Sequence, residues 1–451
     1  FTLSYRSKTS LAKRPLDERI SKTIQIHKQV GELMPAVVTE ESERSLAITV
    51  RSEQLGIWLS VRFDLDENEP DKLAVMSMQP TSPPDASLSE ELIWDSLPDL
   101  LEQVRSDTNI PAIAVAIVED GHIVDQAVSG VRQVGTENAV AKSDGFHIGS
   151  ITKSITATMI GRLVELGQLD WDDTIGDVLT DVDIREEYRN VTIEQLLQHR
   201  SGIDSYLNLE DAEMDRLVNL PGTPTEQRET FVAEVLLSAP IAPAGKEMNY
   251  SNAGYTVAGL MAERASGRSW EELVGIYVLE PIGMEHSGVG WPATEKTPNQ
   301  PRGHFRENDS YRAQRLDEYP LGYFLAPAGN VYCSIDDMAR YAQMHLAGLS
   351  GNDGVLAAET IKRLHTSLDN TGANQSASTN SSYACGWAIV QSTENDLVHS
   401  HSGSAGTFFA AIELYPNESR AIVIAMNVGV EGAGVCETIS KLINERRKNG
   451  P

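Results

Sequence analysis

The stretch Ser150-Ile151-Thr152-Lys153 opens a run of helical periodicity that ends at Gly167. The apolar positions of this run are Ile151, Ile155, Met159, Ile160, Leu163, Val164 and Leu166. This pattern predicts an amphipathic helix with a glycine at its carboxyl end. Ser150 then lies at the helix amino terminus, and Lys153 lies one turn further along on the same side.

A serine and a lysine in this arrangement suit nucleophilic catalysis. A serine hydroxyl is a weak nucleophile until a neighbouring base takes its proton. A lysine can be that base only when it is neutral, which requires burial or nearby positive charge. The alternative is a helix-capping Ser150 and a surface Lys153. A second match to S-x-x-K, Ser10-Leu11-Ala12-Lys13, shows that the motif alone is not specific, so the helical context singles out Ser150.

A second motif, Tyr250-Ser251-Asn252, lies in a loop that opens another predicted helix. A tyrosine held near the lysine can relay protons, and an asparagine amide can hold a substrate carbonyl. The alternative is that Tyr250 fills the loop and Asn252 caps the helix. Three other Tyr-x-Asn matches in the chain show that this motif, too, depends on its context.

The third motif, His401-Ser402-Gly403-Ser404, is expected just before a strand. Glycine at the start of a strand lets a substrate backbone approach closely, so Gly403 and His401 are candidates for substrate binding. The amide of Ser404 can complete an oxyanion hole with the amide of Ser150. His399 and His401 also suggest a metal hydrolase. We expect neither a metal nor another cofactor, because no Asp, Glu or His set at ligand spacing accompanies them.

Taken in order, the three motifs resemble the signature of β-lactamases and penicillin-binding proteins, S-x-x-K, a polar Asn motif and K-T-G. With Tyr-Ser-Asn as the second motif and His-Ser-Gly as the third, the chain resembles the branch of this family that contains class C β-lactamases, D-Ala-D-Ala carboxypeptidases, D-aminopeptidases and family VIII carboxylesterases. The resemblance covers about residues 90–447. Further segments that agree are 196–202, 281–284, 330–340 and 425–427.

The resemblance implies a serine hydrolase that cleaves an ester or amide bond through an acyl-enzyme on Ser150. Carboxylesterase and D-amino-acid peptidase or amidase activities are favoured. β-Lactamase activity is an alternative. In class C β-lactamases a lysine at the place of His401 helps to hold the β-lactam carboxylate, whereas a histidine is mostly neutral near pH 7. A non-catalytic peptidoglycan-binding relative is the alternative from another class. The resemblance assigns catalysis to Ser150, Lys153 and Tyr250, substrate binding to Asn252, His401 and Gly403, and the oxyanion hole to the amides of Ser150 and Ser404.

Composition limits the partners of this 451-residue chain. The 65 acidic and 37 basic residues give a net charge of -28, which disfavours nucleic acid and anionic membranes. No apolar run is long enough to span a bilayer. We expect a small-molecule ester, amide or peptide substrate, and the oligomeric state stays open. Three cysteines cannot provide a disulfide framework. The chain starts at Phe1, and a periplasmic or secreted location is favoured over a cytoplasmic one.

The order of elements predicts an α+β chain with a β-lactamase/transpeptidase-like fold. We expect a small α+β accessory module at 1–79, a linker at 80–88 and a serine hydrolase domain at 89–451, with a helical lobe at about 154–320. The expected helices are 16–33 and 90–105, and the expected strands are 45–51, 55–65, 72–78, 112–118, 123–128, 407–414 and 421–426.

Overall fold

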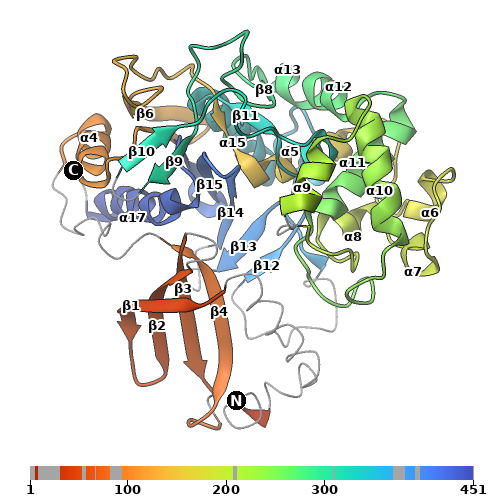
Figure 1. Cartoon of the computed structure of the whole chain (residues 1–451), viewed down its shortest axis with the longest axis horizontal. Helices are drawn as coiled ribbons and strands as arrows, with labels where there is room; N and C mark the ends of the chain where they lie inside the picture. The colour runs from red at the N-terminus through yellow and green to blue at the C-terminus, as the bar shows by residue number, and fades with distance from the viewer. Residues whose placement is uncertain are drawn as a thin grey trace. The chain divides into compact units, whose positions relative to one another are not determined.

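The computed structural model describes residues 6–8, 31–52, 57–66, 68–81, 94–206, 211–307, 310–368, 381–391 and 397–449. They belong to two compact units (Figure 1). The first unit comprises Phe1–Ile93 with Val430–Pro451, and the second comprises Trp94–Gly429.

The first unit contains a four-stranded antiparallel sheet in the order β1-β2-β3-β4. Its strands are β1 (Leu33–Glu41), β2 (Ser45–Ser52), β3 (Ile57–Leu65) and β4 (Leu73–Thr81). Val50, Leu59 and Val61 are buried together on one face and form its small core. The alternation of apolar residues therefore identified β2, β3 and β4, whereas β1 was not expected.

The segments that flank this sheet differ from the sequence expectations. Most of the expected helix at 16–33 lies outside the described residues, and its last residue begins β1. The expected linker at 80–88 begins with two residues that belong to β4, and its remainder lies outside the described residues. Pro80 is tolerated because β4 is an edge strand, where a missing amide donor costs least.

The carboxyl-terminal segment clusters with the first unit, although the sequence assigned residues 89–451 to one domain. The short turn η7 (Val430–Gly432) packs against β3 and β4, and helix α17 (Ala433–Asn449) packs against β4. These contacts join segments about 350 residues apart, which local sequence patterns do not report.

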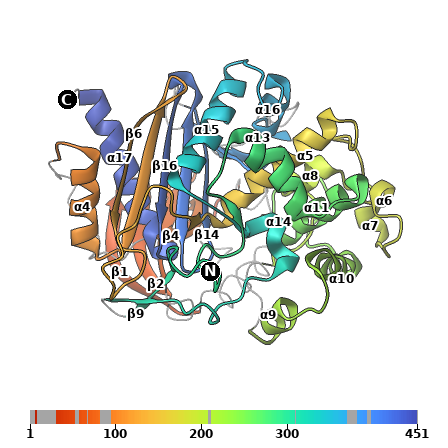
Figure 2. The same ribbon diagram turned by 90° about the horizontal axis from the view of Figure 1, so that it is seen from above.

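The second unit is built on a seven-stranded antiparallel sheet in the order β12-β13-β14-β15-β16-β5-β6. Figure 2 shows β6 in orange close to the blue carboxyl-terminal strands. The strands expected at 112–118, 123–128, 407–414 and 421–426 are confirmed, and in the structure they pair as two hairpins within this one sheet. The strands are β5 (Ala112–Glu119), β6 (His122–Gly130), β12 (Ser381–Tyr383), β13 (Ala388–Gln391), β14 (Leu397–Ser404), β15 (Phe409–Tyr415) and β16 (Arg420–Met426).

Helices cover both faces of this sheet, which explains the composition of its strands. Helix α4 (Leu97–Thr108) packs on β5 and β6, and α15 (Ile335–Leu349) packs on β16 and β5 from the other side (Figure 2). Every residue of the interior strand β16 is buried, and its sequence after Arg420 is a continuous apolar run, whereas all but one residue of the edge strand β6 are at least partly exposed. Helix α4 begins after the capping residue Ser96, later than expected.

The helical lobe surrounds α5 (Thr152–Glu165), which is buried on almost every side rather than amphipathic. Its polar side chains have partners on neighbouring segments. Thr156 donates to the carbonyl of Pro327 at 2.7 Å and accepts from the indole of Trp270 at 3.1 Å. Thr152 accepts from the amide of Val331 at 3.0 Å. Because these groups are satisfied, a helix rich in Ser and Thr can occupy the core.

Further helices and short 3-10 or π-helical segments lie between β6 and β12 in the sequence. They are α6 (Ile175–Val178), α7 (Glu186–Arg189), α8 (Ile193–Leu197), α9 (Asp211–Val218), α10 (Pro224–Leu237), α11 (Asn252–Ser266), α12 (Trp270–Val274), η3 (Gly275–Leu279), α13 (Glu280–Ile282), η4 (Tyr323–Leu325), α14 (Ala326–Gly329) and α16 (Ala358–Leu364). There are also two small sheets among the described residues. In one, β11 (Val331–Cys333) pairs with β7 (Phe146–His147) on one side and β8 (Gly288–Val289) on the other, and in the second β9 (His304–Glu307) pairs with β10 (Ser310–Ala313).

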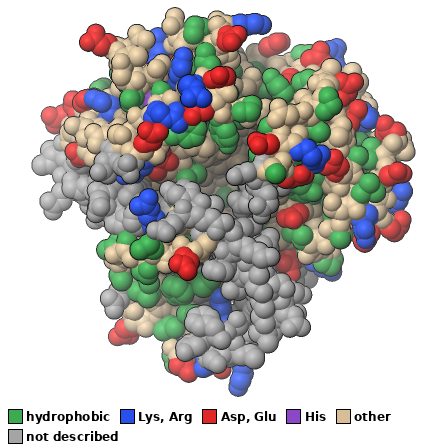
Figure 3. Space-filling view, in the orientation of Figure 1, with side chains coloured by type: hydrophobic (Ala, Val, Ile, Leu, Met, Phe, Trp, Pro, Cys, Tyr) green, Lys and Arg blue, Asp and Glu red, His purple; other side chains and the backbone are tan. Residues whose placement is uncertain are grey.

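Acidic side chains are dispersed over the described part of one face of the molecule. In the face shown in Figure 3, Asp and Glu side chains are scattered between basic and apolar ones. Such a distribution fits a solvated acidic surface. Among the described helices, none has the length and apolar character that crossing a bilayer requires.

Candidate active site

Ser150 lies in the 3-10 turn η2 (Gly149–Ile151), between β7 and the start of α5. The sequence placed it at a helix amino terminus, and the structure agrees. The preceding Gly149 has φ 50, in the left-handed region, and a Cβ there would collide with the backbone of Ser404. Glycine therefore lets the turn pass directly against the end of β14. Ser150 itself is only partly buried, so its hydroxyl can be reached by a substrate.

Lys153 is completely buried beneath Ser150. Its Nζ lies 3.1 Å from Ser150 Oγ, 2.8 Å from Asn252 Oδ1 and 2.8 Å from the carbonyl oxygen of Ala328. Burial lowers the pKa of Lys153 well below its ordinary value of 10.5. No carboxylate is among these partners, so no ion pair in this contact set favours the charged form. The expected surface-lysine alternative is wrong.

Tyr250 covers the amine of Lys153 from the loop before α11. The ring centroid lies 4.7 Å from Lys153 Nζ. Burial raises the pKa of the Tyr250 phenol, and a hydrogen bond with the side chain of Ser150 acts in the opposite direction. The residue after it, Ser251, caps α11 by accepting from the amide of Gly254 at 2.9 Å. This cap fixes where the loop ends, so Tyr250 and Asn252 both reach the Ser150–Lys153 pair.

Asn252 is half-buried at the first turn of α11. Its Oδ1 accepts from Lys153, which orients the amide NH₂ group away from the lysine. An amide in this orientation can donate to a substrate carbonyl. The structure thus brings Ser150, Lys153, Tyr250 and Asn252 together from segments about 100 residues apart.

The third motif precedes β15, the strand expected at 407–414, but the motif is itself the end of a strand, β14, which the sequence did not predict. Residues 397–400 pair with β13, and residues 399–404 pair with β15. A Cβ at Gly403 would collide with the carbonyl of Ile148 and the amide of Ser150. Glycine is therefore needed for a close approach of two backbones rather than for the approach of a substrate. This contact also brings the amides of Ser150 and Ser404 to the same region.

His401 is 8% exposed, and both of its ring nitrogens are engaged. Nδ1 lies 2.7 Å from the carbonyl oxygen of Ser402, so it must be the donor, and Nε2 accepts from the hydroxyl of Tyr383 at 2.9 Å. Burial, followed by the charge of Lys153, lowers the pKa of His401 to about 3. The ring is neutral throughout the ordinary pH range and is held by neighbours from its own sheet.

The other histidine of the H-x-H pair, His399, contacts a different group. Its Nδ1 lies 2.8 Å from Nδ1 of His365. In the described part of the chain, no three His, Cys, Asp or Glu side chains converge as metal ligands would. Both ring nitrogens of His401 and Nδ1 of His399 are engaged with neighbouring groups, whereas Nε2 of His399 is buried without a hydrogen-bond partner among the described residues.

Sequence reasoning missed three groups at this site. They are the Ala328 carbonyl, the ring of Tyr383 and the buried imidazole of His199. The segment 196–202 had been noted only as part of the family resemblance. A backbone carbonyl leaves no sequence signal, and the environment of His199 depends on tyrosines from two other segments.

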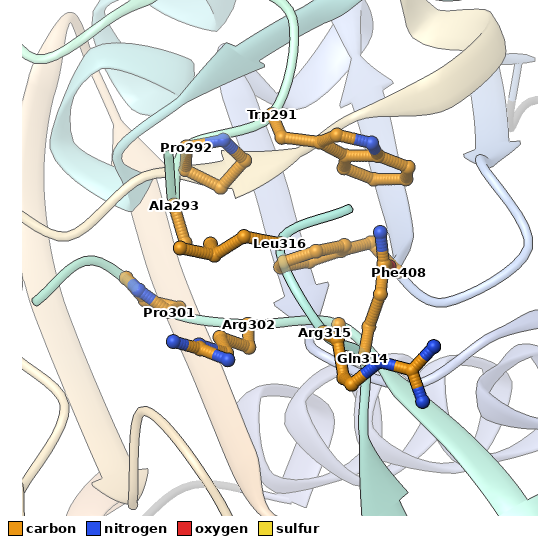
Figure 4. A pocket seen from close by; sticks show the side chains of 10 residues that line it. Trp291, Pro292, Ala293, Pro301, Arg302, Gln314, Arg315, Leu316 and Phe408 are labelled. Atoms are coloured by element: carbon orange, nitrogen blue, oxygen red, sulfur yellow. The ribbon is translucent and has the colours of Figure 1, made fainter. Parts of the chain in front are cut away.

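An open pocket of about 230 Å³ lies beside the third motif rather than over Ser150 (Figure 4). Phe408 lines this pocket and also contacts the third motif, because its main-chain carbonyl accepts a hydrogen bond from Ser404 Oγ at 2.8 Å. Trp291 stacks on Phe408 with ring centroids 5.8 Å apart, and Arg302 and Arg315 lie along the lower edge in the view. The lining residues are Trp291, Pro292, Ala293, Pro301, Arg302, Gly303, Gln314, Arg315, Leu316 and Phe408.

The chain is similar in sequence and in fold to known penicillin-binding proteins. The chain is 26% identical over 350 residues to penicillin-binding protein 4 of Amycolatopsis lactamdurans, covering 76% of this chain and 88% of that protein. The octameric penicillin-binding protein homologue from Pyrococcus abyssi superposes with a TM-score of 0.61 and 28% identity, over 72% of this chain and 71% of that one.

A second solved structure supports the fold. The penicillin-binding protein from Bacillus halodurans superposes with a TM-score of 0.62 over 76% of this chain and 99% of that chain, at 23% identity. The expected β-lactamase/transpeptidase-like α+β fold is therefore confirmed. The family model described as beta-lactamase matches residues 97–439, most of the chain and all three motifs. The chain belongs to the beta-lactamase family, the family of serine hydrolases to which its motifs had pointed.

Proposed function

We propose that this protein hydrolyses esters or amides of small molecules through an acyl-enzyme on Ser150, with Lys153 and Tyr250 transferring protons. The single observation that carries the proposal is the set of three contacts around Lys153 Nζ. Two of the three partners are oxygens that can only accept hydrogen bonds, the side-chain oxygen of Asn252 and the main-chain oxygen of Ala328.

A neutral lysine can use both of its N–H donors and its lone pair with these three partners. An uncharged amine has two N–H donors and one lone pair. If its two donors go to Asn252 and Ala328, each at 2.8 Å, the neutral amine keeps its lone pair to take the proton of Ser150, whose Oγ lies 3.1 Å from Nζ. Burial supports this protonation state, because it lowers the pKa of the amine well below 10.5. Lys153 is therefore suited to be a general base for Ser150.

In the acylation step, Ser150 Oγ attacks the substrate carbonyl carbon while its proton passes to Lys153. The C–O bond to the serine forms, and the carbonyl oxygen becomes an oxyanion that the amides of Ser150 and Ser404 stabilise. Collapse of this intermediate breaks the bond to the leaving group. The leaving group takes up a proton through Tyr250, whose hydroxyl lies beside Ser150.

Deacylation reverses these roles with water as the nucleophile. A water molecule gives a proton to the Lys153–Tyr250 pair and attacks the acyl carbon, and the bond to Ser150 Oγ breaks as that oxygen regains a proton. The acid product leaves, and the pair returns to its starting protonation state. Asn252 orients the substrate carbonyl through its free amide group.

The substrates that this site favours are neutral esters and D-amino-acid peptides or amides. His401 occupies the place of a lysine in class C β-lactamases, and its pKa of about 3 leaves it uncharged. It contributes no fixed positive charge for the carboxylate of a β-lactam, so β-lactamase activity is the second candidate. We assign His401 a positioning role through Tyr383 and the strand backbone rather than a direct bond to substrate.

A substrate panel tests the proposal. We expect turnover of p-nitrophenyl esters or D-amino-acid p-nitroanilides, slower turnover of nitrocefin, full sensitivity to a fluorophosphonate and no effect of a chelator. Ser150→Ala is expected to abolish all turnover. An enzyme that is insensitive to the fluorophosphonate but inhibited by the chelator would instead be a metal hydrolase. A wild type that binds peptidoglycan fragments without turnover or labelling would be the non-catalytic relative.

A further inference from the structure

His199 is a buried histidine that the proposed reaction does not use. It lies two residues after α8, in the left-handed backbone region with φ 57, and is completely buried. Residues other than glycine rarely adopt this conformation, although His, Asn and Asp tolerate it better than most. A strained residue persists when its surroundings require it. The surroundings here are the loop that carries Tyr250.

His199 holds the residues on both sides of Tyr250. Its main-chain carbonyl accepts from the amide of Asn249 at 2.7 Å, and its ring Nδ1 accepts from the amide of Ser251 at 3.0 Å. Its ring also packs on the ring of Tyr250, with centroids 4.2 Å apart and an angle of 41° between the planes. One residue thus fixes the backbone before and after Tyr250 and the face of its side chain.

The hydrogen bond from Ser251 defines the tautomer of His199. Because Nδ1 accepts an N–H, the neutral ring carries its proton on Nε2. This Nε2 is buried with no hydrogen-bond partner among the described residues. The rings of Tyr255 and Tyr383 complete its enclosure, with centroids at 5.2 and 4.7 Å. The ring is therefore held neutral inside an aromatic cage.

The groups named around His199 include no anion that would stabilise a charged ring. The three tyrosines of the cage carry no carboxylate, and Lys153 and His401 oppose a charge on the ring whenever they are protonated. Burial, then Lys153 and then His401, lower the pKa of His199 well below 6.5. Protonation at Nδ1 would also break the bond to the amide of Ser251.

We infer that His199 is a positioning residue for the reaction: a neutral imidazole that clamps the backbone on both sides of Tyr250 and keeps the phenol over Ser150 and Lys153. This inference rests on the proposed function. It predicts that the Nδ1 acceptor matters more than the ring. A displaced Tyr250 would relay protons poorly and would admit water to Lys153. Since burial is the cause of the low pKa of Lys153, water would raise that pKa.

Three substitutions separate the acceptor from the ring. His199→Asn places an oxygen where Nδ1 was, two bonds from Cβ, and tolerates the left-handed backbone. His199→Phe keeps a ring against Tyr250 but leaves the amide of Ser251 without an acceptor. His199→Ala removes both. His122→Ala, on the exposed edge strand β6, is the control for the loss of a histidine.

The measurement is kcat per active site, titrated with a fluorophosphonate so that misfolded protein is excluded, together with the pH profile of kcat/KM on an ester. We expect kcat of the Asn variant and of the control within about fivefold of wild type. We expect the Phe and Ala variants to lose about 10²-fold in kcat with KM within about twofold, and their acidic limb to move upward by about one pH unit.

Each outcome decides the inference. A Phe variant with wild-type kcat and an unmoved acidic limb would overturn it, as would a folded Asn variant that loses as much as Ala. If the Phe and Ala variants do not fold, the Asn variant alone decides: kcat within about fivefold of wild type supports the inference, and a loss of about 10²-fold overturns it. A wild type that the fluorophosphonate does not label overturns the proposed function itself, which separates that failure from the failure of the clamp.

Discussion

Replacing Lys153 by methionine should lower activity and should also remove part of the pH dependence of stability. Methionine matches the length of the side chain but cannot accept the proton of Ser150. A general base contributes about 10²–10⁴-fold to a rate, so we expect kcat to fall by about 10³-fold, or ~4 kcal/mol. The bonds to Asn252 and Ala328 are also lost.

The effect on stability follows from the buried, neutral amine. In the folded protein the pKa of Lys153 is well below 10.5, and in the unfolded chain the lysine regains its ordinary value. Between these two values the unfolded state binds one more proton, so the free energy of unfolding rises with pH. One proton corresponds to about 1.4 kcal/mol per pH unit. The variant lacks this contribution.

Urea unfolding of wild type and Lys153→Met at pH 7, 8 and 9 measures the difference. The free energy of unfolding of wild type should gain up to about 1.4 kcal/mol per pH unit relative to the variant. Lys142→Met removes an exposed lysine and should behave as wild type in both assays. Parallel pH dependences of wild type and Lys153→Met would refute a neutral, buried lysine, and a variant with normal kcat would refute its role as base.

Two further predictions concern residues around the site and in the core. Gly403→Ala should lower kcat by about 10²-fold or destabilise the fold by about 1–3 kcal/mol, because the added Cβ would collide with the amide of Ser150. Gly275→Ala is the control, because a Cβ at Gly275 meets open space. Equal kcat and melting temperature in the two variants would contradict the close approach. The free energy of unfolding of wild type should fall as the pH drops from 6.5 towards 4, because burial lowers the pKa of His304 to about 4 and the unfolded chain takes up a proton first. His304→Gln should reduce this dependence on pH in acid unfolding curves. An unchanged slope would count against the assignment.

Much of the fold and of the candidate site could be predicted because the relevant patterns are local. The period of two in residues 45–65 identified β2 and β3, and apolar runs around Asp120-Gly121 identified the β5–β6 hairpin. The motifs of Ser150 and Tyr250 each open a helix. The apolar periodicity after Ser150 marks the first helix, and the capping residue Ser251 marks the start of the second. The assembly of these motifs into one site followed from the family resemblance.

What the sequence did not reveal depends on contacts between distant segments. α5 was expected to have a polar face, but Thr156 finds partners more than 100 residues away, so the helix is buried instead. His401 was expected to face a substrate, yet the hydroxyl of Tyr383 occupies its free nitrogen. The strand β1 has no clean alternation, since bulges interrupt its pairing with β2.

The most direct test of the central claim is the mass of the protein after reaction with a fluorophosphonate, followed by peptide mapping. The proposed function predicts one phosphonyl group per chain, with loss of fluoride, on the peptide that contains Ser150. Ser150→Ala should acquire no such group and should lose at least about 10⁴-fold in kcat, or ~5.4 kcal/mol, while Ser10→Ala, the other match to S-x-x-K, should react as wild type. A phosphonyl group on a different residue, or labelling of Ser150→Ala to the same extent as wild type, would contradict the assignment of Ser150 as the nucleophile.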